Sequence, residues 1–262
     1  MDDLVEKLRS AVNERIKGRT ADAINILELL AANTESEQSA EVWGNLIGAF
    51  LETGMFKQAE DAALERLRVV QHASTEGVMV RFQLASARQR QGQFQAAVKE
   101  YAEILKWESY LIECDDSGFL HAVRLQLAVC LAHLGNNPAA LALLEKVDIQ
   151  ALDPEQRAEA AYYIGQCYYE MQNYEAAADA YRQAMEGPVP AFQIRGRYSV
   201  GLALWQLHRD SDALEVLLPL ANQPQSDVPQ EYLYSVLSRI YTELGNLEQA
   251  THFAKLGGLP RA

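Results

Sequence analysis

Three cysteines are the first residues of this sequence that could carry chemistry, as a redox pair or as metal ligands. They are Cys114, Cys130 and Cys167, an odd number without CxxC spacing, which suits a reducing compartment better than a disulfide framework or a zinc site. Cys130 and Cys167 hold equivalent positions on two predicted helices, which would stand about 10 Å apart. A disulfide needs a shorter separation, so we expect buried thiols, with a redox pair as the alternative.

Histidines and carboxylates offer no catalytic constellation. The sequence contains no GxxxxGK[ST], HExxH or GxSxG motif and no glycine-rich turn between a strand and a helix. The carboxylates lie mostly on the second helix of each predicted helix pair, where a solvated face explains them without catalysis. The histidines are dispersed along the chain: His72, His121, His133, His208 and His252. We therefore predict a protein that is not an enzyme and that has no cofactor and no metal site.

The charge balance argues against two classes of partner. The 262 residues include 36 acidic and 23 basic side chains, for a formal charge of -13, which disfavours non-specific attraction to nucleic acid or anionic lipid. The first residues, MDDLVEKLRS, are acidic where a secretory signal would be basic, and no apolar run approaches the ~18 residues of a membrane span. These features predict a cytoplasmic protein without nucleic-acid or membrane partners.

The predicted helices that position these residues follow a repeated sequence pattern. A turn residue is followed five positions later by alanine in seven places, which lie 36 to 43 residues apart. The pairs are Gly18 and Ala23, Gly54 and Ala59, Gly92 and Ala97, Gly135 and Ala140, Gln172 and Ala177, His208 and Ala213, and Gly245 and Ala250. Amphipathic segments with a 3.6-residue period flank each turn, so each repeat should contain two helices.

Two copies of the repeat contain a second pattern in their first helix. Trp43, Leu46 and Phe50 have W-x2-L…Y spacing, and residues 164–168 fit L-G-x2-Y. The pattern resembles the tetratricopeptide repeat, a helix-turn-helix unit of 34 residues, over nearly the whole chain. The resemblance implies an all-α, right-handed α-solenoid of about seven repeats and about 14 helices, in a single domain over residues 1–262. The approximate repeats are 2–35, 39–73, 75–113, 117–150, 154–187, 190–223 and 227–257.

Small residues recur where the backbones of neighbouring helices would cross. In first helices they are Ala11, Ala85, Ala128, Gly165, Gly201 and Ser238. A bulky side chain at these positions would force the helices apart, and larger residues should fill the remaining gaps. The third junction, around 107–121, is the longest. There we expect a lengthened second helix, an acidic turn over 114–118 and a helix restarting near Ser117, as a tolerated surface loop or as a bend in the superhelix.

The resemblance also implies a concave groove, lined by first helices, that holds a peptide or a helix of a partner protein. First-helix windows of the third to sixth repeats have a net charge of +4, and the second-helix windows a net charge of -6. The arginines of the groove side would face a ligand. Alternatively, Arg81, Arg124 and Arg197, which share one register, would extend over the helix pair.

Residues at i, i+3, i+7 and i+10 of a first helix share one face, and aromatic residues at these positions gather toward the carboxyl-terminal half. Tyr, Trp and Arg are enriched among interface hot spots. Core packing with the hydroxyl at the rim is the alternative for some of the tyrosines. The predicted partner-binding residues are Phe82, Arg90, Tyr162, Gln166, Tyr169, Arg195, Tyr198, Trp205, Tyr232 and Arg239.

Two functional hypotheses follow. The first is a non-enzymatic interaction module, a scaffold or adaptor, that binds a protein or peptide partner in the groove. Trp205→Ala should then weaken partner binding without changing the oligomeric state. The second is an assembly scaffold that forms homo-oligomers through its carboxyl-terminal end, where KLGGLPRA follows the last predicted helix without a capping helix. Polar residues of that helix, such as Glu248 and Lys255, would instead make the end soluble.

Overall fold

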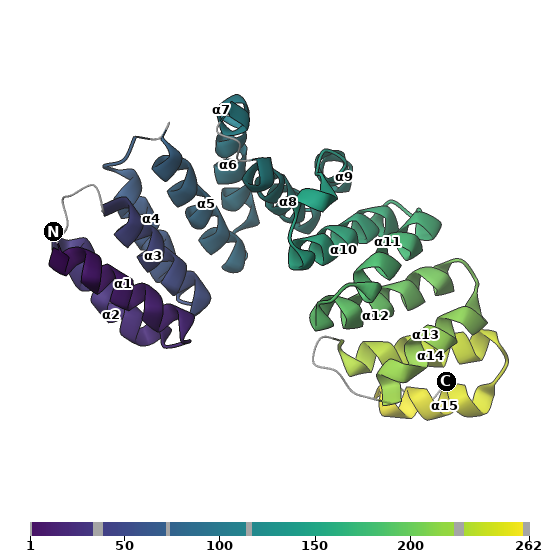
Figure 1. Cartoon of the computed structure of the whole chain (residues 1–262). Coiled ribbons are helices and arrows are strands. Elements are labelled where there is room, and N and C mark those ends of the chain that lie inside the picture. Colours follow the sequence, from purple (N-terminus) through teal and green to yellow (C-terminus); the bar gives the residue numbers. More distant parts are fainter. Residues whose placement is uncertain (1, 34–38, 72–73, 114–116, 223–227, 259–262) are drawn as a thin grey trace. The chain divides into compact units, whose positions relative to one another are not determined.

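The computed structural model describes residues 2–33, 39–71, 74–113, 117–222 and 228–258. Over these residues it contains fifteen α-helices, one 3-10 helix and no strand, which confirms the all-α prediction (Figure 1). The chain forms two compact units, Met1–Leu134 and Gly135–Ala262, and each is treated separately below. The single domain over 1–262 stays a prediction.

Unit 1 is a stack of helix hairpins in which each of the first five helices packs on the next and α6 packs on α8. First helices α1, α3 and α5 alternate with second helices α2, α4 and α6. Their bounds are α1 Asp2–Ile16, α2 Thr20–Asn33, α3 Ser39–Glu52, α4 Phe56–Leu67, α5 Thr75–Arg90, α6 Phe94–Leu105, α7 Glu108–Glu113 and α8 Ser117–His133.

Unit 2 repeats this arrangement. The first helices α10, α12 and α14 lie side by side, because α12 contacts both of the others, and α11, α13 and α15 are their second helices. The bounds are α9 Asn137–Leu144, η1 Ile149–Ala151, α10 Pro154–Glu170, α11 Tyr174–Glu186, α12 Pro190–Gln206, α13 Asp210–Asn222, α14 Gln230–Glu243 and α15 Leu247–Leu256.

The seven predicted turn residues all adopt the left-handed backbone conformation, which explains why glycine dominates there. The five glycines have φ angles of 73° to 77°. Gln172 and His208 stand at the other two turns, with φ angles of 61° and 55°. This conformation ends the first helix and reverses the chain into the second one.

The close approach of the two helices within a repeat rests on pairs of one small and one large residue, sixteen positions apart. A Cβ atom added to Gly201 of α12 would lie 2.4 Å from Leu217 of α13, and one added to Gly165 of α10 would lie 2.6 Å from the ring of Tyr181 of α11. Ala85 of α5 and Tyr101 of α6 have the same spacing and are both fully buried. The large side chain therefore occupies the space that the small residue leaves.

In the second repeat the pair is reversed. Ile47 of the first helix α3 is large, and Ala63 of the second helix α4 is small, and both are fully buried in one core cluster. This exchange explains why isoleucine stands at the usual glycine position. The last repeat departs from the rule, because Ser238 of α14 and Ala254 of α15 are both small. The hydroxyl of Ser238 donates a hydrogen bond of 2.9 Å to the backbone carbonyl of Ala250.

The expected lengthening of the helix at the third junction is wrong, because α6 ends at Leu105 and a separate short helix, α7, follows. The backbone N–H groups of Lys106 and Trp107 donate to carbonyls three residues back, a tightening that ends an α-helix. The buried Leu111 anchors α7. The restart of α8 at Ser117 is confirmed, while residues 114–116 of the expected acidic turn lie outside the described residues.

Candidate functional site

Three parallel first helices position the candidate residues of unit 2. Helix α10 starts with a capping box between Asp153 and Gln156, next to Pro154 at its first turn, so its register is fixed from its first residue. Residues three and seven positions apart then share one face. The adjacent α12 and α14 continue that face, because α12 contacts both neighbours.

Four tyrosines from these three helices form a tyrosine cluster, consisting of Tyr162 and Tyr169 of α10, Tyr198 of α12 and Tyr232 of α14. The pKa of Tyr198 is raised, first by burial and then by the phenol groups of Tyr169, Tyr162 and Tyr232. Phenol groups on both neighbouring helices therefore lie near Tyr198. The structure thus brings together four of the predicted binding residues on one face.

The second helix α11 packs against the tyrosine cluster. Tyr181 is buried and forms a hydrogen bond with Ser199, and burial followed by the nearby Tyr162 raises the pKa of its phenol. The ring of Tyr162 lies 5.5 Å from that of Tyr181, and the ring of Tyr169 lies 5.2 Å from that of Tyr174. These ring contacts hold the α10 tyrosines in place, so part of their surface is core, as the alternative interpretation expected.

Sequence reasoning missed two polar partners of the predicted residues. The side chain of Gln206 forms a hydrogen bond with Tyr169, whose pKa is raised overall, mainly by burial. Trp205 donates a hydrogen bond of 2.9 Å from Nε1 to Oε2 of Glu243, at the end of α14. Trp205 also packs against the core cluster of unit 2. No spacing within one repeat could have shown these contacts, because they join neighbouring repeats.

The remaining predicted residues of unit 2 differ in exposure. Tyr232 is 68% exposed, and Arg195 and Arg239 are also exposed, while Gln166 is half-buried. Tyr232 and Arg239 are seven residues apart on α14 and share its face. The face therefore combines a half-buried aromatic surface with exposed tyrosine and arginine side chains.

Phe82 and Arg90 belong to unit 1. Phe82 of α5 makes edge contacts with the rings of Tyr101 and Phe119, at 5.6 and 5.1 Å, so its ring links α5 with α6 and α8. Arg90, at the end of α5, is exposed. The structure thus gives Phe82 a packing role and leaves Arg90 accessible to solvent.

Several arginines on the first helices of unit 1 pair with carboxylates. Arg81 pairs with Glu100 of α6, and Arg124 of α8 pairs with Glu108 at 2.6 Å. Arg88 bridges Glu100, at 2.8 Å, and Glu60 of α4, at 3.1 Å. These pairs favour the interpretation that Arg81 and Arg124 extend over the helix pair, and they reduce the positive charge inferred for this side.

Comparison with known proteins supports the repeat assignment. The sequence profile of the tetratricopeptide repeat matches residues 159–186. A tetratricopeptide repeat protein from Parabacteroides merdae is similar to the chain with a TM-score of 0.65 at 15% identity, over 98% of this chain and 93% of that one. The chain has the tetratricopeptide repeat fold. Folds of this type generally mediate protein–protein interactions.

Two further solved structures share the tetratricopeptide repeat fold of this chain. A signal transduction ATPase with numerous domains from Pyrococcus horikoshii, which has a tetratricopeptide repeat sensor, gives a TM-score of 0.74 at 13% identity, over 98% of this chain and 41% of its own. A Rap protein complexed with competence and sporulation factor gives a TM-score of 0.57 at 14% identity, over 96% of this chain and 73% of its own. Among curated proteins, no sequence matches the chain.

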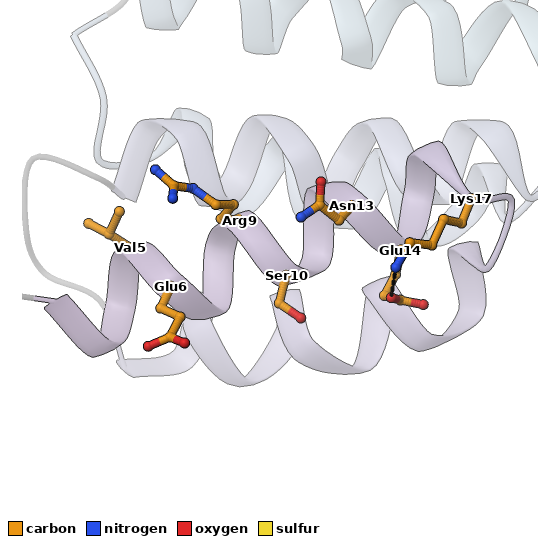
Figure 2. A pocket seen from close by; sticks show the side chains of 7 residues that line it. All are labelled: Val5, Glu6, Arg9, Ser10, Asn13, Glu14 and Lys17. Carbon is orange, nitrogen blue, oxygen red and sulfur yellow. Dashed lines mark hydrogen bonds and ion pairs between the residues drawn. The ribbon is translucent and has the colours of Figure 1, made fainter.

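Other sites on the tetratricopeptide repeat units offer little chemistry. In the described part of the chain, no group of three metal-ligating side chains could hold an ion, and no described helix is long and apolar enough to cross a membrane. A hollow of about 570 Å³ lies on α1. Figure 2 shows that its side chains come from α1 and from Lys17 directly after it, which forms an ion pair with Glu14 at 3.2 Å. One helix cannot enclose a ligand.

The two described cysteines of the repeat core, Cys130 and Cys167, are both buried. Burial, with a smaller contribution from Glu170, raises the pKa of Cys167 to about 11. The thiolate needed for nucleophilic chemistry is therefore scarce at neutral pH. Cys114 lies outside the described residues.

Proposed function

We propose that this chain is a non-enzymatic interaction module that binds a peptide or a segment of a partner protein on the first-helix face of unit 2. The observation that carries the proposal is the tyrosine cluster, in which residues of α10, α12 and α14 meet around Tyr198. Tyrosine supplies a large contact surface and a hydrogen-bonding hydroxyl at low entropic cost. The Rap protein complexed with competence and sporulation factor supports a binding role for this fold.

The exposed members of the face define what it would bind. Arg195 and Arg239 add two guanidinium groups beside the tyrosine cluster, and arginine pairs with carboxylates through two parallel hydrogen bonds. We therefore propose a segment with aromatic or aliphatic anchors and at least one acidic residue. Trp205 is a less direct contact, because its indole N–H is already bonded to Glu243.

The test uses the exposed residues, since Trp205→Ala would also remove core packing. Peptides selected against the full chain from a random library would be measured by calorimetry with Tyr232→Ala and Arg239→Ala. Each change should weaken binding by about 2 kcal/mol if these are hot spots. Leu247→Ala on α15, which is equally exposed at 68%, and Arg182→Ala on α11 are the matched controls and should leave binding unchanged.

The proposal fails if the Tyr232 and Arg239 variants bind as tightly as the unchanged chain, or if the controls weaken binding equally. Assembly through α15 is the second candidate function. The exposed Leu247 and Leu256 favour it, although Glu248, His252 and Lys255 share the exposed surface of that helix. Light scattering at high concentration, with Leu247→Asp, tests this candidate separately: a monomer in the unchanged chain would remove it.

A further inference from the structure

The second-helix side of unit 1 holds a pocket that the proposed function does not use. It has a volume of about 360 Å³ and lies between α2 and α4, over α3. That volume is at the lower end of the range of about 300–1,000 Å³ found for small-ligand sites. Three helices line it, so it differs from the hollow on α1, which one helix lines.

The floor of the pocket is apolar and rigid. Trp43, Leu46 and Phe50 lie three and seven positions apart on α3 and present one face to it. Leu46 and Phe50 are only 4% and 5% exposed, and all three pack in the core cluster of unit 1. Trp43 is half-buried, so part of its indole remains accessible from the pocket. Ala31 of α2 lines the wall beside it.

The rim of the pocket carries negative charge. Glu28 of α2 and Asp61 and Glu65 of α4 line it, and none of the described lysines or arginines does. Asp61 pairs with Lys57 at 2.9 Å, and both side chains are more than half exposed, so this pair is weak. Glu28 and Glu65 are exposed, and neither forms a salt bridge with another described residue. Two carboxylates thus flank an accessible indole.

From this juxtaposition we infer that the pocket binds an arginine side chain of a basic segment in a partner protein. The aliphatic stem of the arginine packs on the apolar floor, and its planar guanidinium stacks on Trp43, the best aromatic partner for a cation. The guanidinium then donates hydrogen bonds to the rim carboxylates Glu28 and Glu65. An acidic segment, which suits the face of unit 2, would be repelled here.

This inference is independent of the proposed function, because it concerns a different unit and a partner segment of opposite charge. Its probe is the amidated peptide Ac-Gly-Arg-Leu-Arg-Gly, titrated into the full chain carrying Trp107→Phe and Trp205→Phe, so that Trp43 is the only tryptophan that reports binding. The matched peptide has citrulline in place of each arginine. Citrulline keeps the shape of the side chain and removes its charge.

The expected result is a saturable change in Trp43 emission with the arginine peptide at low salt, weakened by added NaCl, and at least about tenfold weaker with citrulline. Glu28→Gln with Glu65→Gln should weaken binding about tenfold as well. Glu175→Gln with Glu215→Gln, two exposed acids on second helices of unit 2, changes the net charge equally and should have no effect. All four positions are exposed, so these variants keep the fold.

Four outcomes would overturn the inference. The citrulline peptide could bind as well as the arginine peptide, which would indicate an apolar site without charge recognition. The control pair of variants could weaken binding as much as the rim pair, which would indicate attraction to the net charge of the chain. Finally, Trp43 emission could stay unchanged up to millimolar peptide. Binding of free arginine at the same concentration as the peptide would assign the site to a small molecule and also contradict a protein partner.

Discussion

The contact between Gly201 and Leu217 gives a prediction whose sign is decided by two opposing effects. In Gly201→Ala, the new Cβ would lie 2.4 Å from both Cγ and Cδ2 of Leu217, and Leu217 is fully buried. Overpacking of this kind costs about 1–3 kcal/mol, while alanine favours a helix interior over glycine by about 1 kcal/mol. We expect a net loss of stability of about 1 kcal/mol.

Gly44 provides the control, because it lies within α3 and a Cβ there would have no neighbour within 4 Å. Gly44→Ala should therefore show only the gain in helix propensity, about 1 kcal/mol. Urea unfolding of both variants would be followed by circular dichroism and, for unit 2, by the emission of Trp205 in chains that also carry Trp43→Phe and Trp107→Phe. A Gly201→Ala variant that is stabilised as much as Gly44→Ala would refute the close-approach argument.

A double-mutant cycle identifies the side chain responsible. Leu217→Ala alone should cost about 2–5 kcal/mol, because it leaves a cavity. In that background Gly201→Ala meets no bulky side chain and should raise stability by about 1 kcal/mol, a reversal of sign. If Gly201→Ala costs the same in both backgrounds, Leu217 is not the cause and the pairing is wrong.

Four further changes test other parts of the structure. Arg88→Ala should lower the free energy of unfolding by about 2–4 kcal/mol, because it removes a guanidinium from the buried Glu60. In the same urea titration, Arg90→Ala, at an exposed site, should change the free energy of unfolding by less than about 0.5 kcal/mol. Burial raises the pKa of Glu60, but hydrogen bonds, one of them from Arg88, lower this pKa overall. The ionised Glu60 therefore stabilises the fold above about pH 4.3, and this stabilisation is lost as the pH falls through the lowered pKa. The urea midpoints of the unchanged chain and of Glu60→Gln should therefore converge between pH 7 and pH 3. His208→Gly should raise the melting temperature, because it relieves a left-handed conformation that costs a non-glycine residue about 1 kcal/mol. Cys167, with a pKa of about 11, should react with Ellman's reagent at pH 8 only after urea is added. Comparison with Cys167→Ser identifies its share of the labelling, and fast labelling of Cys167 in the folded chain would contradict its burial.

The repeat was legible in the sequence because two local requirements impose it. A left-handed turn favours glycine, so Gly18 and its equivalents mark each reversal of the chain, and a close helix crossing requires a small residue such as Ala177. The break between α6 and α7 has no such requirement. Lys106 and Trp107 end α6 through a tightened hydrogen-bond pattern, and neither residue type indicates it.

The candidate site was predictable only in part. The helical spacing placed Tyr162, Tyr198 and Tyr232 on first helices, but charge counted along a helix does not show where a side chain points. The net charge of +4 on the first helices includes Arg88, yet its guanidinium lies between Glu60 and Glu100 of two second helices. The pocket over Trp43 was equally invisible, because its walls come from two helices on either side of α3.

The reversed pair of Ile47 and Ala63 limits how such a repeat can change over time. In this pair, as in the pairs of Ala85 with Tyr101, Gly165 with Tyr181 and Gly201 with Leu217, one large and one small residue share the space between two helices, and either helix can supply the larger member. An exchange takes two substitutions, and its intermediate has either both large residues or both small ones. The crowded intermediate costs about 1–3 kcal/mol and the hollow one about 2–5 kcal/mol. Neither position in a pair can therefore vary independently, even though each tolerates very different residues once its partner has changed.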